Sequence, residues 1–177
     1  VSLFLQELDD GRTALEHIVA GLGSEGVLIM LGTGEAEYER RVSTIAERCE
    51  RLLFLRGYSE RLAEALYRGG NLFLMPSSFE PCGISQMLAM RAAQPVVAHA
   101  TGGLCDTVED GRTGFLFDGE TPRAQAAAFV ATVERALTMR TRDYEEWQNL
   151  CIRAACERFD WAASARATIA ELYENGN

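Results

Sequence analysis

Short apolar runs alternate along this chain with stretches that have the apolar spacing of helices, and this alternation constrains the fold most. The runs are continuously apolar, which is typical of strands buried on both faces of a parallel sheet. Together they predict an α/β fold with a doubly wound, Rossmann-like, six-stranded parallel sheet. The six runs are Val1–Leu5, Val27–Leu31, Arg51–Leu55, Leu72–Met75, Pro95–Ala98 and Gly114–Phe117.

Helical patterns fill the spaces between these runs and take over the chain after Asp118. The earlier helices are expected at Arg12–Leu22, Ala36–Glu47, Glu60–Arg68 and Ile84–Ala93, with Ser59 as the N-cap of the third. The later ones are expected at Thr121–Met139, Asp143–Glu157 and Asp160–Tyr173. Because no linker or repeat interrupts the pattern, we expect residues 1–177 to form a single domain. Residues 121–177 would form its C-terminal helical layer on the sheet.

Composition excludes several functional classes. The 177 residues carry a net charge of -9, which argues against nucleic acid or an anionic membrane as a partner, because both need a basic face. No apolar run approaches the roughly 18 residues of a membrane span. Five scattered cysteines without C-x-x-C spacing, and two isolated histidines, argue against a metal site and fit reduced thiols in the cytoplasm. Seventeen arginines and no lysine make up the basic residues.

In doubly wound folds ligands bind outside the carboxyl ends of the strands, so ligand-binding residues are expected in the loops there. Glu80 lies in such a loop. Gly83 opens the next helix, whose first amides have no intrahelical partners and favour a phosphate together with the helix dipole. The pair Gly102-Gly103 follows the next strand and lets a backbone approach a ligand closely. Together these features predict a pocket for a phosphorylated ligand; singly, each also fits a plain strand-to-helix corner.

The same stretch resembles a known family. "PSSFEPCGISQ", "ATGGLCDTV" and "DGRTGFLF" are similar to the C-terminal domain of bacterial glycogen synthases and plant starch synthases, retaining glucosyltransferases of the GT-B fold. "LGTGE", "GYSERLAEALYRGGNLFLMPS" and "RFDWAASARATIAELY" extend the resemblance over nearly the whole chain. It implies an ADP-glucose or UDP-glucose donor and an α-1,4-glucan acceptor held by an N-terminal domain absent from this sequence. It also implies that no metal and no cofactor take part. The implied location is the cytoplasm or, for a plant or alga, the plastid.

Carried over residue by residue, the resemblance makes Glu80 the catalytic-site carboxylate that contacts the sugar hydroxyls of the donor. Tyr58 would stack on the adenine ring, and the backbone would hold the glucose and the distal phosphate. The donor-binding positions implied in this way are Tyr58, Cys82, Gly83, Ile84, Ser85, Thr101, Gly102 and Gly103.

The N-terminal residues depart from the family's pattern. Where the family places an Arg and a Lys against the leaving diphosphate, this chain has Leu3 (or Phe4) and Leu8 or Asp9. A diphosphate leaving group needs positive charge, so the isolated chain is expected to be inactive. Two interpretations stay open: the donor-binding half of a transferase, or a degenerate domain that serves as a binding or regulatory module. A sugar-nucleotide epimerase is disfavoured because the first loop lacks G-x-G-x-x-G.

Overall fold

The computed structural model describes residues 1–24 and 26–174 and confirms an α/β fold in which all the paired strands are parallel. The strands form two sheets. β1 (Leu28–Gly32) pairs with β2 (Leu52–Arg56), with Leu28 opposite Leu52. β4 (Val96–His99) lies between β3 (Phe73–Met75) and β5 (Gly114–Phe117). Each of these five strands lies within one residue of the predicted bounds.

The prediction of a first strand at Val1–Leu5, and with it the six-stranded sheet, is wrong. Residues 2–5 form a turn, in which the Leu5 amide donates to the Ser2 carbonyl at 3.1 Å. Leu3, Phe4 and Leu5 are nevertheless buried, each at most 7% exposed. An apolar run predicts burial but not one particular backbone conformation. Here the run is buried in a turn that packs on the core.

Helices follow the strands as expected, and their first residues explain where they begin. α1 (Ala14–Gly21) begins at a capping box in which Thr13 and Glu16 satisfy each other's backbone amides. α3 (Glu60–Gly69) is capped by Ser59, whose hydroxyl accepts from the Leu62 amide at 3.3 Å. The other helices of this part are α2 (Ala36–Ala46), α4 (Ser85–Arg91) and α5 (Gly103–Thr107). The short α5 was not predicted.

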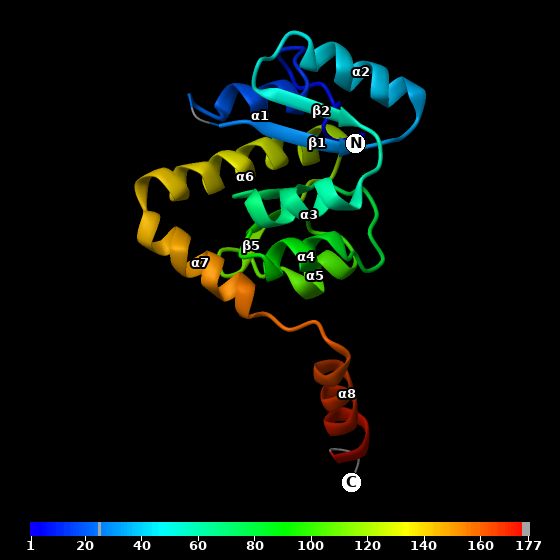
Figure 1. Cartoon of the computed structure of the whole chain (residues 1–177), viewed down its shortest axis with the longest axis vertical. Coiled ribbons are helices and arrows are strands. Elements are labelled where there is room, and N and C mark those ends of the chain that lie inside the picture. Colours follow the sequence, from blue (N-terminus) through cyan, green and yellow to red (C-terminus); the bar gives the residue numbers. More distant parts are fainter. Residues whose placement is uncertain (25, 175–177) are drawn as a thin grey trace.

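The last third of the chain is helical, but its helices differ in their packing. α6 (Pro122–Arg142) packs on β4, β5 and α1, and α7 (Tyr144–Cys156) packs on α6 and α4. α8 (Trp161–Ile169) and the π-helix Ala170–Glu174 instead lead away from the body of the molecule (Figure 1). Trp161 is accordingly 91% exposed. Of the helices in the described ranges, none is both long and apolar enough to cross a bilayer.

One apolar core joins the two sheets to α1 and α6. Phe129 of α6 lies at its centre, with ring centroids 5.2 Å from Phe4 of the N-terminal turn and 5.0 Å from Phe117 of β5. Partly buried residues of β1, β2 and β3 pack against this same cluster. Met75 and Ala98, near the carboxyl ends of β3 and β4 where the candidate site lies, pack instead in a second apolar cluster that includes Leu104.

Candidate functional site

The loops that follow β3 and β4 touch through their backbones. The Gly103 amide donates to the Glu80 carbonyl at 3.1 Å. A Cβ atom at Gly102 would lie 2.0 Å from that carbonyl oxygen, and one at Gly103 would lie 2.5 Å from the Cys82 oxygen. Gly102 also has a φ of +48°, which side chains disfavour. The two glycines are thus required because one loop backbone lies against the other.

The FEPC segment, residues 79–82 in the loop after β3, forms the solvent-exposed side of this contact. Phe79 is 79% exposed, Cys82 is exposed, and Glu80 is half-buried. The Glu80 carbonyl accepts the hydrogen bond from Gly103, while the residue as a whole is only half-buried. A ligand at this edge could therefore reach the Glu80 side chain, while the Glu80 backbone is held by its hydrogen bond with Gly103.

A buried glutamine hydrogen-bonds to the same loop from the protein interior, and it was not among the residues predicted from the sequence. Gln86 is fully buried in the first turn of α4, and its Nε2 donates to the carbonyls of Cys82 and Gly83 at 3.0 Å each. It also donates to Thr107 Oγ1 of α5 at 3.3 Å. A Cβ at Gly83, whose φ is +78°, would lie 2.4 Å from Gln86 Oε1. A side-chain amide three residues after a glycine, at the start of a helix, was the available signal.

The start of α4 lies directly after this supported loop. Ser85 is the first helical residue, and Ile84 is the N-cap, with no side chain bonding to the first amides. Ile84 is 67% exposed and Ser85 is half-buried. The structure therefore brings Glu80 and Cys82 against Gly102 and Gly103 at the carboxyl ends of β3 and β4, with Gly83, Ile84, Ser85 and Thr101 beside them in the sequence.

His99, the last residue of β4, lies under the same loops. Its Nδ1 donates to the Ser77 carbonyl at 2.8 Å, and its ring stacks on Phe117 at 5.2 Å between centroids. Its buried Nε2 is 3.4 Å from Asp118 Oδ1, within ion-pair distance but without a hydrogen bond. These contacts make His99 a support for the loop after β3.

Tyr58 belongs to the other sheet, at the carboxyl end of β2. It follows Gly57 and is 85% exposed, and its hydroxyl donates to Glu60 at 3.1 Å. This hydrogen bond and the charge of Glu60 raise the pKa of the Tyr58 phenol. The exposed ring leaves a face available for stacking.

The DGRTG segment is built as a turn that anchors β5. Asp110 Oδ1 accepts from the Leu116 amide at 2.8 Å, and its Oδ2 accepts from Arg135 of α6 at 3.1 Å. The Gly111 amide donates to the Gly114 carbonyl at 2.8 Å, with Gly111 at a φ of +72°. The contacts of this motif are structural.

Most of the N-terminal positions that depart from the family's pattern pack on the apolar core. Leu3 and Phe4 are buried in the core, and Leu8 packs against it half-buried. Asp9 is exposed and pairs with Arg123 at 3.0 Å. Arg12, the nearest arginine in sequence, donates to the Glu16 carbonyl at 3.1 Å.

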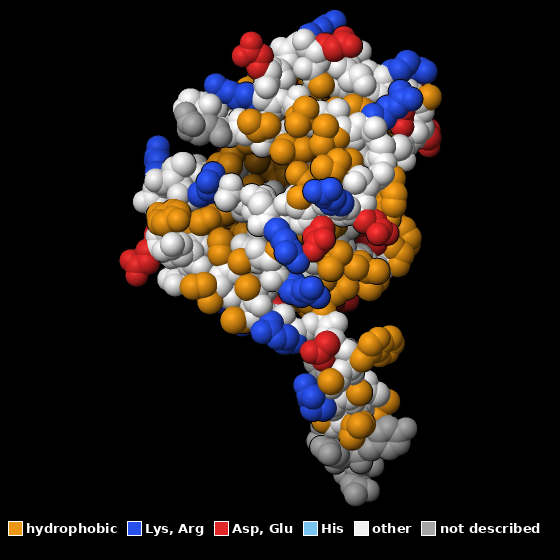
Figure 2. Space-filling model, viewed as in Figure 1, with side chains coloured by type: hydrophobic (Ala, Val, Ile, Leu, Met, Phe, Trp, Pro, Cys, Tyr) orange, Lys and Arg blue, Asp and Glu red, His pale blue; other side chains and the backbone are white. Residues whose placement is uncertain are grey.

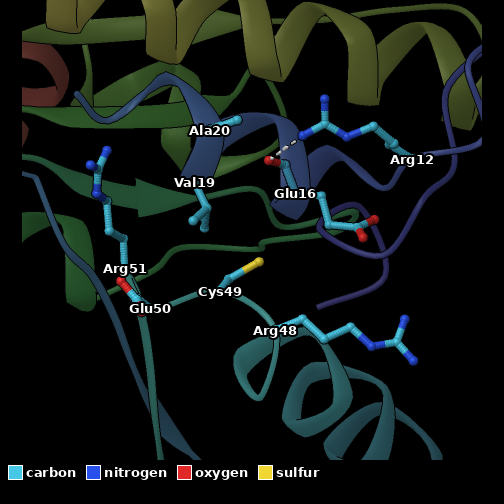
Figure 3. Close-up of a pocket in the computed structure, with 8 residues that line it drawn as sticks. All are labelled: Arg12, Glu16, Val19, Ala20, Arg48, Cys49, Glu50 and Arg51. Atoms are coloured by element: carbon cyan, nitrogen blue, oxygen red, sulfur yellow. Dashed lines mark hydrogen bonds between the residues drawn. The ribbon is translucent and has the colours of Figure 1, made fainter. Parts of the chain in front are cut away.

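A cavity of about 460 Å³ lies elsewhere, between α1 and the segment 48–51 that leads into β2 (Figure 3). Because this segment precedes β2, the cavity lies at the amino end of that strand, opposite the loops described above. Arg12 and Arg48 point away from each other in Figure 3, and Glu16 is engaged with Thr13 at 2.8 Å. We therefore assign the candidate site by its chemistry to the loops after β3 and β4 rather than to this cavity.

The sequence and the structure both match known proteins. Residues 6–137 match the family described as "Glycosyl transferases group 1". The chain is 40% identical over 166 residues to the glycogen synthase of Anaeromyxobacter sp. (strain Fw109-5), covering 88% of this chain and 34% of that protein. It is 38% identical over 172 residues to the glycogen synthase of Thioalkalivibrio sulfidiphilus, covering 92% and 34%. The chain thus spans about a third of the length of the curated relatives it matches.

Solved structures of glycosyltransferases also superpose on this chain. The catalytic domain of Starch Synthase IV from Arabidopsis thaliana, bound to ADP and acarbose, superposes with a TM-score of 0.72 at 31% identity, covering 80% of this chain and 31% of that chain. Anabaena Alr3699/HepE in complex with UDP-glucose superposes with a TM-score of 0.67 at 24% identity, covering 89% and 43%, and supports the fold alone.

Proposed function

The chain belongs to the glycosyl transferases group 1 family, and on that premise we propose that it binds the nucleotide-sugar donor of a glycogen- or starch-synthase-like glucosyltransferase. The observation that carries the proposal is the backbone contact between Glu80 and Gly103, with no room for a side chain at Gly102. It holds Glu80 at the carboxyl ends of parallel strands, where α/β folds bind ligands. The donor is ADP-glucose or UDP-glucose, and the Arabidopsis starch synthase solved with ADP supports the first.

Each part of the surface has a role in this proposal. Glu80 contacts the sugar hydroxyls; that the residue is only half-buried supports this role. The backbone of Cys82 and Gly83 lies beside the glucose, held from below by Gln86. The amides of Ile84 and Ser85, with no side-chain cap, bind the distal phosphate.

The remaining contacts come from two other loops. The exposed ring of Tyr58 stacks on the base, and stacking of this kind needs an aromatic face in contact with solvent. Thr101, Gly102 and Gly103 form the wall behind the sugar. Tyr58 follows β2 of the smaller sheet, so the site draws on both sheets.

The complete transferase needs more than this chain. A GT-B enzyme works between two domains, and the chain spans about a third of its curated relatives. We propose that the α-glucan acceptor binds to a second, N-terminal domain, and that residues 1–177 alone do not transfer glucose. The five cysteines are all free, which accords with a reducing cytoplasmic location.

A second candidate function is a degenerate donor domain that binds without turnover. The observation that favours it is the burial of Leu3 and Phe4, with Leu8 packed half-buried on the core, where the family pattern leads us to expect cations. Departure of a diphosphate needs positive charge, and losing one such group costs about 3 kcal/mol.

Calorimetric titration with ADP-glucose, UDP-glucose and ADP tests the proposal. We expect binding in roughly the micromolar to millimolar range typical of substrate sites. Glu80→Ala should weaken ADP-glucose about tenfold or more and leave ADP nearly unchanged, because only the sugar contacts the carboxylate. Tyr58→Ala should weaken ADP-glucose and ADP equally.

Exposed residues of the same types on α7 provide matched controls: Glu145→Ala and Tyr144→Ala should change nothing. If neither nucleotide sugar binds at several millimolar, or if Glu80→Ala weakens ADP as much as ADP-glucose, the assigned donor site is wrong. Binding by the complete protein with no glucan synthesis on a primer would favour the degenerate domain.

A further inference from the structure

The loop after β3 is anchored at two of its backbone carbonyls, and both partners come from the end of β4. The Glu80 carbonyl accepts from the Gly103 amide at 3.1 Å, and the Ser77 carbonyl accepts from Nδ1 of His99 at 2.8 Å. The backbone from Ser77 to Glu80 is therefore held at both ends. Of these two anchors, only the one at Ser77 is made by a side chain, so it is the one that protonation or substitution can change.

His99 is buried, and its two ring nitrogens face different acceptors. Figure 2 shows Arg, Asp and Glu side chains spread over the surface, whereas His99 is 5% exposed. Nδ1 carries a proton, because the Ser77 carbonyl opposite it can only accept. Nε2 has no hydrogen bond among the described residues, and the carboxylate oxygen Oδ1 of Asp118 lies 3.4 Å from it. A neutral ring would therefore place its buried Nε2 lone pair beside a second acceptor.

A proton on Nε2 removes this conflict. The charged ring pairs with Asp118, and it donates to Ser77 a charge-assisted hydrogen bond that is stronger than that of the neutral ring. The Gly119 amide donates to the same Asp118 oxygen at 2.7 Å and holds it in place. The helices that pack on β4, α4 and α6, have only uncharged buried residues. Within the described ranges, Asp118 is thus the charged side chain at ion-pair distance from His99.

We propose that His99 is a positioning residue of the donor site, and that its doubly protonated form orients the loop that carries Glu80. This inference rests on the proposed function, in which Glu80 contacts the sugar of the donor. The backbone carbonyl of His99 also accepts from the Thr101 amide at 2.8 Å, where the glycine turn after β4 begins. His99 therefore contacts the loops that follow all three strands of its sheet, β3, β4 and β5.

The expected effect is confined to the sugar part of the donor. Glu80 contacts the sugar, whereas Tyr58 and the first amides of α4 contact the base and the phosphate. Loss of the proton on Nε2 weakens the anchor at Ser77 and leaves the anchor at Gly103 intact. The affinity for ADP-glucose should therefore fall as rising pH removes this proton, while the affinity for ADP changes little.

Calorimetric titration of the whole chain with ADP-glucose and with ADP, from about pH 5.5 to about pH 8.5, tests the proposal. Nitrogen NMR of the imidazole ring follows the protonation of His99 in the same samples. The affinity for ADP-glucose relative to ADP should fall about threefold as His99 loses its second ring proton.

Two variants separate the hydrogen bond from the charge. His99→Phe keeps a ring on Phe117 but removes both donors, and it should weaken ADP-glucose about fivefold and leave ADP nearly unchanged. His99→Asn returns an amide donor for the Ser77 carbonyl without the charge. It should recover most of the lost affinity but not its pH dependence. If urea unfolding shows that His99→Phe does not fold, His99→Asn and the pH profile of the natural chain decide.

His17, the only other histidine of the sequence, provides the matched control. It lies on α1, 3.1 Å from Asp10, so His17→Asn should leave both affinities and their pH dependence unchanged. The role of His99 is refuted, and the proposed function kept, if Glu80→Ala weakens ADP-glucose selectively while His99→Phe does not. Equal weakening of both ligands by His99→Phe, or a pH profile that does not follow the His99 ring, also refutes it. A natural chain that binds no ADP-glucose refutes both.

Discussion

β4 and β1 are both apolar parallel strands of the same fold, yet they are buried to different degrees. Every residue of β4 is at most 5% exposed, whereas β1 has no buried residue and its Ile29 is 40% exposed. β4 has a hydrogen-bonded neighbour on each side and α6 packed on it; β1 has one neighbour. The two sequences are about equally apolar, so burial follows from position within the sheet rather than from composition.

The loops at the ends of the strands show the same contrast. After β3 and β4, added Cβ atoms at Gly83, Gly102 and Gly103 would meet neighbouring atoms within 2.5 Å. After β1, nothing lies within 4 Å of a Cβ added at Gly32 or Gly34. The sheet of β3–β5 is closely packed both at its strands and at its loops. The sheet of β1–β2 is less closely packed at both, and the two sheets are called the closed and the open part below.

Replacing one phenylalanine in each of the two sheets should give the largest difference in unfolding free energy. Phe115→Ala in β5 removes a fully buried ring that stacks on Trp147, and we expect it to cost about 4 kcal/mol of unfolding free energy. Phe54→Ala in β2 removes a half-buried ring and should cost about 1–2 kcal/mol. Urea unfolding measures both; equal costs would mean that the two sheets are equally closed.

Gly102→Ala probes closure at the loops and should cost about 3 kcal/mol, since it adds a clash with the Glu80 carbonyl to backbone strain. Gly111→Ala has a similar positive φ in open space and should cost about 1 kcal/mol. Gly34→Ala, open and without a positive φ, should be nearly neutral. Thermal unfolding of the three variants separates clash from strain, and a Gly102→Ala cost no larger than that of Gly111→Ala would refute the close contact.

Gln86→Ala should cost about 2 kcal/mol, because the carbonyls of Cys82 and Gly83 lose their buried donor. Gln125→Ala, which removes one half-buried hydrogen bond to Gly119, should cost about 1 kcal/mol. Chemical denaturation gives the two values. If the proposed donor site is correct, Gln86→Ala also weakens nucleotide-sugar binding, while Gln125→Ala leaves it intact.

The smallest expected effect concerns acid stability. Burial raises the pKa of the Asp110 carboxyl, but the hydrogen bonds from Arg135 and the Leu116 amide more than offset this, so its pKa lies below the ordinary 3.8. The unfolded chain therefore takes up the proton first as the pH falls. The stabilisation is complete above about pH 3.8 and is lost as the pH falls through the folded pKa.

Asp110→Asn should remove this acid-dependent contribution, at most about 1 kcal/mol for a pair nearly half exposed. Asp10→Asn provides the comparison: the Arg12 amide and His17 lower the pKa of Asp10, but both partners are near in sequence, two and seven residues away, whereas Arg135 is 25 residues from Asp110. Unfolding midpoints measured from pH 5 down to pH 2 should therefore shift more for Asp110→Asn. A larger shift for Asp10→Asn would contradict the comparison.

Sequence patterns predicted what depends on neighbours along the chain. The strands from Val27 to Phe117 and the Ser59 cap were confirmed, because apolar runs and caps are local features. The Val1–Leu5 strand failed because its apolar residues find their burial in a turn. For the candidate site, the sequence marked the loops around Glu80 and Gly102 but missed Gln86, whose contacts with Thr107 arise only after two helices have packed.

The interlocked loops have a consequence for how this protein can vary. A side chain at Gly83 would need the space that Gln86 occupies, and side chains at Gly102 and Gly103 would need the space of the Glu80 and Cys82 backbone. A random library should therefore show strong epistasis here: single changes at these four positions fail, and few pairs compensate, since the atoms they meet include fixed carbonyls. Diversification toward new donors should proceed instead at the exposed tip, through Phe79 and Cys82, which the scaffold leaves free to differ.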